Sequence, residues 1–158
     1  MKRLFLCLLV LFGMTASKVA ADDFNIAAKS AIAVDATSGK IPYEKDANTP
    51  IEVGSITNLL TVYLVYEAID RGDLTADTYV DISDYAYNLI SNPNISNVPL
   101  EAKRYKVKDL IAASLMSSSN SATIALAEKV GGSEENFVQM MKAKLKEWGI
   151  KDATIVNS

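Results

Sequence analysis

Hydrophobic and polar positions along the chain predict a hairpin followed by a long helix. Residues 30–35 and 41–45 have the composition of two short strands, joined by a turn in which Gly39 supplies the positive φ that such turns favour. From Gly54 to about Gly72, apolar residues recur at the spacing of one face of an amphipathic helix. The positions on that face are Ile56, Leu59, Leu60, Tyr63 and Leu64.

The second half of the chain is predicted to be mainly helical. A strand is expected at 79–82, and a loop rich in Asn, Ser and Pro at 88–99. Helical periodicity returns over 107–116 and again over 122–130. The small polar run at 117–120 separates these helices, because such side chains compete for backbone hydrogen bonds and favour a new helix cap.

A last helix is predicted after Ser133, which is placed to cap it. Glu134 and Glu135 lie in its first turn, where the helix dipole favours anions, and Gly149 follows its last turn. Its apolar stripe consists of Phe137, Met140, Met141, Leu145 and Trp148. Residues 152–158 then have the pattern of the start of an extended segment, and no Gly, charge cluster or cap residue ends that segment.

Composition restricts the chemistry that this chain can perform. The 158 residues include no His and one Cys, which excludes Ser-His-Asp and Cys-His nucleophiles, zinc sites built on His, and an internal disulfide framework. Catalysis must therefore use hydroxyl groups, carboxylates, Lys or Tyr. With 16 basic against 19 acidic residues, the chain lacks the basic surface that phosphate neutralisation requires, so we expect no nucleic-acid partner.

The N-terminus has the order of a secretory signal peptide. Lys2 and Arg3 precede an apolar run at 4–14, and small residues follow at 16–21. The run is shorter than the roughly 17–25 residues of a membrane-spanning helix, so we expect cleavage after Ala21, with membrane contact only before that cleavage. The exported chain, residues 22–158, would keep 13 basic and 19 acidic residues, a net charge of −6, and no Cys.

Two serine-containing segments are the candidate sites for chemistry. Ser55 lies at a predicted helix start, where unpaired backbone N–H groups can stabilise an oxyanion. Ser118-Ser119-Asn120 lies where two helices meet. Each segment taken alone is more simply interpreted as a helix cap, so spacing by itself supports no functional assignment.

Taken together in order, these segments resemble a known family. Ser55-Ile56-Thr57-Asn58 and the residues that follow are similar to the Ser-x-x-Lys segment of the serine D-alanyl-D-alanine carboxypeptidases, the low-molecular-weight penicillin-binding proteins of peptidase family S11. Ser118-Ser119-Asn120 matches the family's Ser-x-Asn element, and the predicted hairpin matches the family's first strands. The resemblance runs from about Lys29 to Ser158.

The resemblance implies an α+β fold of the β-lactamase/transpeptidase type, a helical cluster against an antiparallel sheet, here truncated before the central strands. It implies that Ser55 attacks the carbonyl between two D-alanines of a peptidoglycan stem peptide and is also acylated by β-lactams. In the family, the lysine at the position occupied here by Asn58 takes the proton of the serine hydroxyl. Ser118 would pass a proton to the leaving amine, and Asn120 would bind the substrate amide. The resemblance requires no cofactor or metal, and it implies a location at the cell-wall face of the membrane or outside the cell.

Two departures from the family pattern reduce the expected activity. Asn58 has no titratable proton near neutrality, so it cannot act as general base, and the family's Lys-Thr-Gly strand is absent from the chain. Nothing in the sequence indicates that Lys103, Lys106 or Lys108 lies beside Ser55 as a substitute base. We therefore expect an N-terminal portion of a carboxypeptidase that is impaired or inactive. The alternatives are a non-catalytic peptidoglycan- or β-lactam-binding protein and a relative of the serine β-lactamases.

Overall fold

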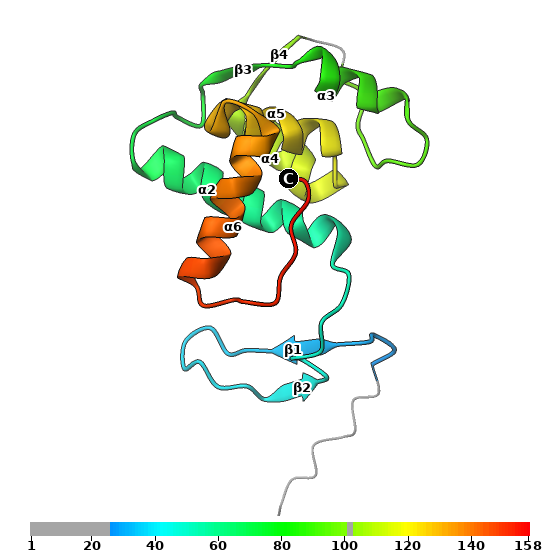
Figure 1. Cartoon of the computed structure of the whole chain (residues 1–158), viewed down its shortest axis with the longest axis vertical. Helices are drawn as coiled ribbons and strands as arrows, with labels where there is room; N and C mark the ends of the chain where they lie inside the picture. The colour runs from blue at the N-terminus through cyan, green and yellow to red at the C-terminus, as the bar shows by residue number, and fades with distance from the viewer. Residues whose placement is uncertain (1–25, 101–102) are drawn as a thin grey trace, which may run out of the picture. The chain divides into compact units, whose positions relative to one another are not determined.

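The computed structural model describes residues 26–100 and 103–158. The predicted signal segment, 1–21, lies outside them. The chain divides into two compact units, one that ends at Thr49 and one that begins at Pro50. The first unit contributes a hairpin, and the second unit contributes the helices and every candidate site residue (Figure 1).

The first unit contains the hairpin that the sequence predicts. β1 (Ala31–Ala33) pairs antiparallel with β2 (Tyr43–Lys45), and the strands are shorter than the apolar pattern suggested. The turn is held by Asp35, whose Oδ1 accepts hydrogen bonds from the Ser38 backbone N–H at 2.7 Å and from the Ser38 hydroxyl at 2.6 Å. Gly39 adopts a φ of +69°, which explains the preference for glycine at this position.

The second unit is a helical cluster that carries one small antiparallel sheet. In this sheet β3 pairs with β4, with Val80 opposite Tyr105. With the hairpin of the first unit, the described chain is helix-rich and α+β in class. The elements of the second unit are η1 (Gly54–Ile56), α2 (Thr57–Asp70), β3 (Tyr79–Asp81), α3 (Asp84–Asn88), η2 (Leu89–Ser91), β4 (Arg104–Lys106), α4 (Val107–Ser117), α5 (Asn120–Gly131) and α6 (Glu134–Glu147).

The ends of α5 and α6 lie close to where the local sequence predicts them. Ser119 caps α5 by accepting from the Ala122 backbone N–H, and Ser133 caps α6 by accepting from the Asn136 backbone N–H. Gly132, with a φ of +78°, ends α5 in the left-handed conformation. The sequence did not predict the short helix α3 or strand β4, which are five and three residues long.

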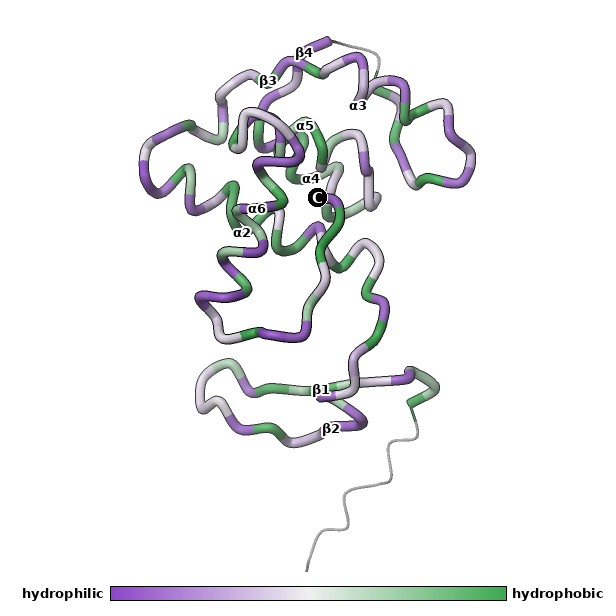
Figure 2. The backbone as a smooth tube through the Cα atoms, in the orientation of Figure 1, coloured by the Kyte–Doolittle hydropathy of each residue, from purple (hydrophilic) through white to green (hydrophobic). Residues whose placement is uncertain are grey.

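Helix α5 is the centre of the second unit. It contacts α2, α4 and α6, and all seven of its residues from Ser121 to Ala127 are buried. One apolar cluster packs α2, α4 and α5 around Val65 and Leu126, and a second joins α5 and α6 to the C-terminal segment around Phe137 and Ile155. In Figure 2, where the tube is coloured by residue hydropathy, hydrophobic residues are concentrated where these helices meet.

The buried face of α2 differs from the predicted stripe. Ile56 and Leu59 are each 59% exposed, and Tyr63 is also exposed. The side chains that turn inward are Asn58, Thr61, Val62, Leu64, Val65 and Ala68. Because α2 has apolar residues around most of its circumference, periodicity alone does not decide which face is covered. The packing of α4 and α5 decides it.

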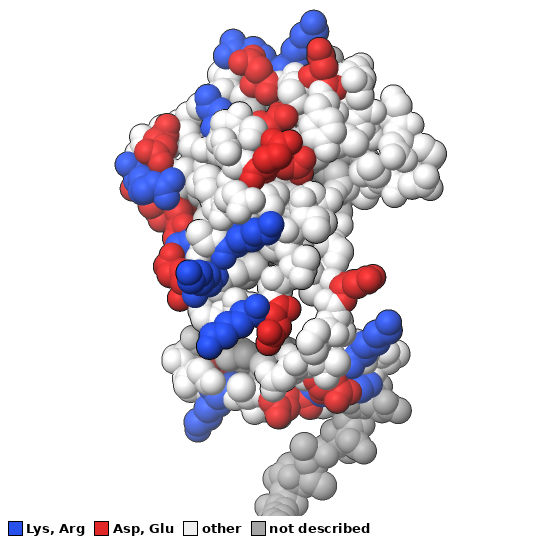
Figure 3. Space-filling model, viewed as in Figure 1, with Lys and Arg blue, Asp and Glu red and all other residues white. Residues whose placement is uncertain are grey.

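The surface of the described chain has mixed charge. Acidic and basic side chains are interspersed over the face shown in Figure 3. Within residues 26–100 and 103–158, no helix combines the length and the apolar character needed to cross a bilayer.

Candidate active site

Ser55 lies in a tight turn immediately before α2. The turn begins at Gly54, which has a φ of +51°, and the Thr57 hydroxyl donates to the Gly54 carbonyl oxygen at 2.9 Å. No side chain caps η1 or α2. The simpler interpretation of Ser55 as a helix cap is therefore wrong, and its hydroxyl stands at the helix start without that structural role.

Asn58 lies in the first turn of α2 and points into the protein. Its side chain is 3% exposed, and its Nδ2 donates to the carbonyl oxygen of Ser114 at 3.2 Å. At the end of α4 the chain enters the left-handed conformation at Ser118, and the Ser118 backbone N–H returns to the Ala113 carbonyl oxygen. The Ser114 oxygen therefore loses the partner that a continuing helix would supply. The amide of Asn58 replaces that partner from a different helix.

A buried chain of hydroxyl groups continues this contact into α5. The Ser114 and Thr123 hydroxyls lie 2.7 Å apart, and the Thr123 hydroxyl donates to the Ser119 carbonyl oxygen at 2.8 Å. Because Thr123 uses its proton for Ser119, Ser114 is the donor to Thr123. Position 58 is thereby linked through α4 to the residue that caps α5, and all of these side chains are buried.

Ser118 and Asn120 are held by the loop that precedes β4. Ser118 has a φ of +50°, a conformation that is uncommon for a residue with a side chain. The backbone N–H and the Nδ2 of Asn120 each donate to the Ser96 carbonyl oxygen at 3.0 Å, and the Ser96 hydroxyl donates to the Ser117 carbonyl oxygen at 2.9 Å. Since the amide nitrogen of Asn120 is used in this way, its Oδ1 is the atom left to accept from a ligand.

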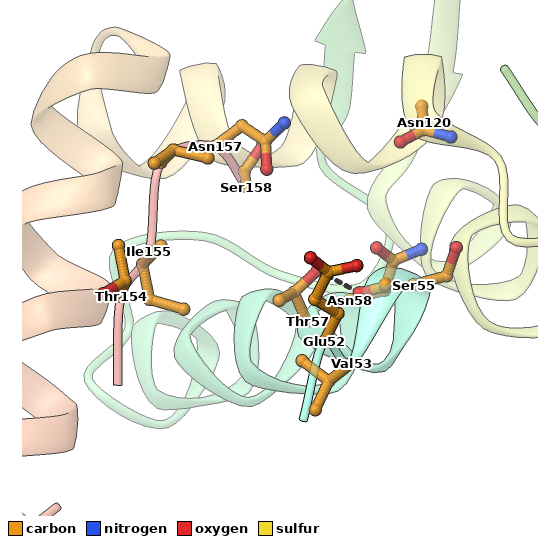
Figure 4. A pocket seen from close by; sticks show the side chains of 12 residues that line it. Glu52, Val53, Ser55, Thr57, Asn58, Asn120, Thr154, Ile155, Asn157 and Ser158 are labelled. Carbon is orange, nitrogen blue, oxygen red and sulfur yellow. Dashed lines mark hydrogen bonds between the residues drawn. The ribbon is translucent and has the colours of Figure 1, made fainter. Parts of the chain in front are cut away.

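The four candidate residues line two adjoining cavities in the second unit. Ser55, Asn58 and Asn120 line a cavity of about 400 Å³, and Ser55, Asn58 and Ser118 line one of about 330 Å³. Ser55 and Asn58 are common to both. Figure 4 shows these two residues together at the start of α2, with Asn120 across the cavity at the start of α5.

The far wall of the larger cavity is formed by residues 154–158. Ile155 anchors this segment in the second apolar cluster. Both the backbone N–H and the hydroxyl of Ser158 donate to Glu134 Oε1, at 3.1 and 3.0 Å. In Figure 4 the segment lies across the cavity from Ser55.

Charge is sparse around the two cavities. Glu52 is the one charged side chain among the described residues that line them, and no lysine does so. Lys106 and Lys108 instead bind Asp77 at 3.0 and 2.9 Å, and these hydrogen bonds lower the pKa of Asp77 to about 2. Neither lysine replaces the base that position 58 lacks.

The sequence did not identify several residues that support the site. Ser114 and Thr123 are polar positions on otherwise buried helix faces, and this is a signal that could have been noticed. Ser96 and residues 154–158 carry no such signal, because their proximity to Ser55 arises only from the path of the chain.

Comparison with known proteins places the chain among penicillin-binding proteins. The sequence model of the D-alanyl-D-alanine carboxypeptidases of peptidase family S11 matches residues 15–158. The D-alanyl-D-alanine carboxypeptidase DacF of Bacillus subtilis is 34% identical over 131 residues, which cover 82% of this chain and 33% of DacF. The chain thus spans about a third of the length of this curated relative.

Solved structures give the same result. The peptidoglycan synthesis regulatory factor PBP3 of Streptococcus pneumoniae is 63% identical with a TM-score of 0.80, over 85% of this chain and 37% of PBP3. Penicillin-binding protein D2 of Listeria monocytogenes, in its ampicillin-bound form, is 25% identical with a TM-score of 0.68, over 82% of this chain and 50% of that protein.

Proposed function

Because the chain belongs to the D-alanyl-D-alanine carboxypeptidase family, we propose that residues 22–158 are the N-terminal part of a carboxypeptidase domain that meets peptidoglycan at the outer face of the cytoplasmic membrane. Residues 1–21 serve as the signal peptide that directs export. N-terminal sequencing of the exported protein tests this assignment, with Asp22 expected as the first residue. A retained segment 1–21 would contradict it.

In this proposal Ser55 is the nucleophile. The proposed reaction is attack of the Ser55 hydroxyl on the carbonyl that joins the two D-alanines of a stem peptide. The hydroxyl proton must pass to a general base, the acyl group forms on Ser55, and the terminal D-alanine leaves. Ser118 passes a proton to the leaving amine, and Asn120 Oδ1 accepts from the substrate amide. The placement of all three residues around two adjoining cavities supports these roles. The same geometry suits a β-lactam, and the D2 protein of Listeria holds ampicillin.

We further propose that this site is impaired in the first proton transfer. The hydrogen bond from Asn58 Nδ2 to the Ser114 carbonyl oxygen carries this proposal. It shows a neutral amide that is already engaged as a donor at the position where the family has its lysine. An amide cannot take the Ser55 proton, and loss of a positioned general base costs about 10²–10⁴ in rate. The 158 residues also contain no Lys-Thr-Gly.

Binding without turnover is the second candidate function. Its support is that the chain with Asn58 at this position has both cavities, while the Asn58 side chain is itself buried and hydrogen-bonded. A stem peptide or a penicillin would then be held reversibly. A third possibility, a role related to the serine β-lactamases, is less well supported because the family match is to the carboxypeptidases.

Fluorescent penicillin distinguishes these functions. The purified chain is incubated with the probe, and covalent labelling is followed by gel fluorescence and peptide mass spectrometry. We expect no adduct on Ser55, and labelling there would refute the impaired site. Equilibrium titration with a tripeptide that ends in D-Ala-D-Ala measures reversible binding, and saturation without product supports the second candidate.

Two variants locate the cause of the impairment. Asn58→Lys restores the family's residue, and Ser55→Ala removes the proposed nucleophile. If Asn58→Lys becomes labelled and the double variant with Ser55→Ala does not, residue 58 limits acylation. If Asn58→Lys folds and stays unlabelled, the absence of Lys-Thr-Gly is sufficient to prevent acylation of Ser55 by penicillin.

A further inference from the structure

A third hollow lies at the C-terminal end of α6, and none of its lining residues lines the two cavities around Ser55. It has a volume of about 510 Å³, and three of its lining residues are Lys142, Lys146 and Lys151. Leu145 and Ile150 supply apolar wall between these lysines. The hollow therefore combines positive charge with aliphatic surface.

The three lysines of the hollow form no ion pair with the described residues, unlike five of the ten basic side chains of the second unit. Arg71, Arg104, Lys106, Lys108 and Lys144 each form an ion pair with an Asp or Glu. Among the ion pairs of the described residues, none involves the three lysines of the hollow. Their ammonium groups are therefore not held in ion pairs by the described residues.

The spacing of these residues explains how the charges converge. Lys142 and Lys146 are four residues apart on α6 and so share one helix face, with Leu145 beside them. The chain then turns at Gly149, which has a φ of +76°, and brings Ile150 and Lys151 to the same hollow. Lysines at a helix C-terminus are favoured by the helix dipole. The dipole accounts for charge in the last turn of α6, but not for Lys151 beyond it or for the apolar wall.

We propose that this hollow binds an anionic phospholipid. Its phosphate lies among the lysine ammonium groups, and the first carbons of its acyl chains pack on Leu145 and Ile150. Lysine binds phosphate as a point charge, and burial of methylene groups adds affinity. No carboxylate and no aromatic ring line the hollow among the described residues, which favours a phosphate with an aliphatic tail over a cation or a nucleotide base.

Short-chain lipids that stay monomeric test the proposal with the full chain. The probes are dihexanoyl phosphatidylglycerol, dihexanoyl phosphatidylcholine and glycerol phosphate, each below its micelle concentration. Trp148, the single Trp of the chain, lies between Lys146 and Gly149 and reports binding by its fluorescence. We expect phosphatidylglycerol to bind about tenfold more tightly than either other probe, because only it supplies both net charge and tail. Added salt should weaken this binding.

Matched variants assign the binding to the hollow. Lys142→Gln with Lys146→Gln should weaken phosphatidylglycerol binding about tenfold, whereas Lys103→Gln with Lys129→Gln removes the same charge elsewhere and should leave it unchanged. Ile150→Ala should weaken the lipid and not glycerol phosphate. Equal loss in both double variants, equal binding of the three probes, or no saturable binding would each overturn the proposal.

Discussion

Replacing Asn58 with Ala removes the side chain that connects α2 to the end of α4. In the native protein its Nδ2 lies 3.2 Å from the Ser114 carbonyl oxygen, and the side chain is 3% exposed. The Ser118 backbone N–H, the usual helical partner of the Ser114 oxygen, turns back to Ala113 instead. The variant therefore removes the hydrogen bond that the Asn58 amide donates to this buried carbonyl.

The size of the effect follows from burial. A buried polar group left without its partner costs about 1–3 kcal/mol, and the cavity left by the missing amide adds to that cost. For a domain of this size, such a loss lowers the midpoint of thermal unfolding by about 3–10 °C. Asn58→Leu fills the space but supplies no donor to the Ser114 carbonyl, so it should also destabilise the protein.

Urea and thermal unfolding, followed by far-ultraviolet circular dichroism, measure both variants. Asn136→Ala and Asn136→Leu are matched controls, because Asn136 is an exposed residue of α6. These controls should change the free energy of unfolding by less than about 0.5 kcal/mol. If Asn58→Ala and Asn58→Leu behave like the controls, the contact between α2 and α4 does not stabilise the fold and the reasoning fails.

Three further predictions concern packing, pH and association. Gly131→Ala should destabilise the protein by about 1–3 kcal/mol in urea unfolding, because its Cβ would lie 2.8 Å from the Phe137 backbone nitrogen; an unchanged midpoint would contradict this. The lowered pKa of Asp77, about 2, stabilises the fold above its unfolded value of 3.8, and this contribution is lost as pH falls toward 2. As pH falls from 3.8 toward 2, the Asp77→Asn variant should therefore lose less free energy of unfolding than the native protein. An equal loss in both proteins would refute the assignment. Leu59 and Met116 are 59% and 85% exposed, so we expect concentration-dependent association in sedimentation experiments that Leu59→Lys with Met116→Lys reduces; a native monomer at high concentration would count against it.

Local sequence was sufficient for the turns and caps. Gly39 marks the hairpin turn, and Ser119 and Ser133 mark the starts of α5 and α6. These features could be predicted because a cap or a turn is stabilised by bonds between residues two to four positions apart. The residues of the candidate site were named for a different reason, because two short contiguous motifs, taken in order, resemble those of the carboxypeptidase family.

Tertiary structure decided the features that depend on contacts between distant segments. It determined that α2 buries Asn58 and Val65 and exposes Leu59, although all three lie on one helix. It also placed the Ser114 carbonyl oxygen within reach of Asn58 and brought residues 154–158 across from Ser55. Such contacts join residues dozens of positions apart, so they are set by how the helices pack together and not by the preferences of any one segment. The sequence by itself therefore supplied the candidate residues for the chemistry, and only the packed structure decided that the amide at position 58 bonds one helix to another.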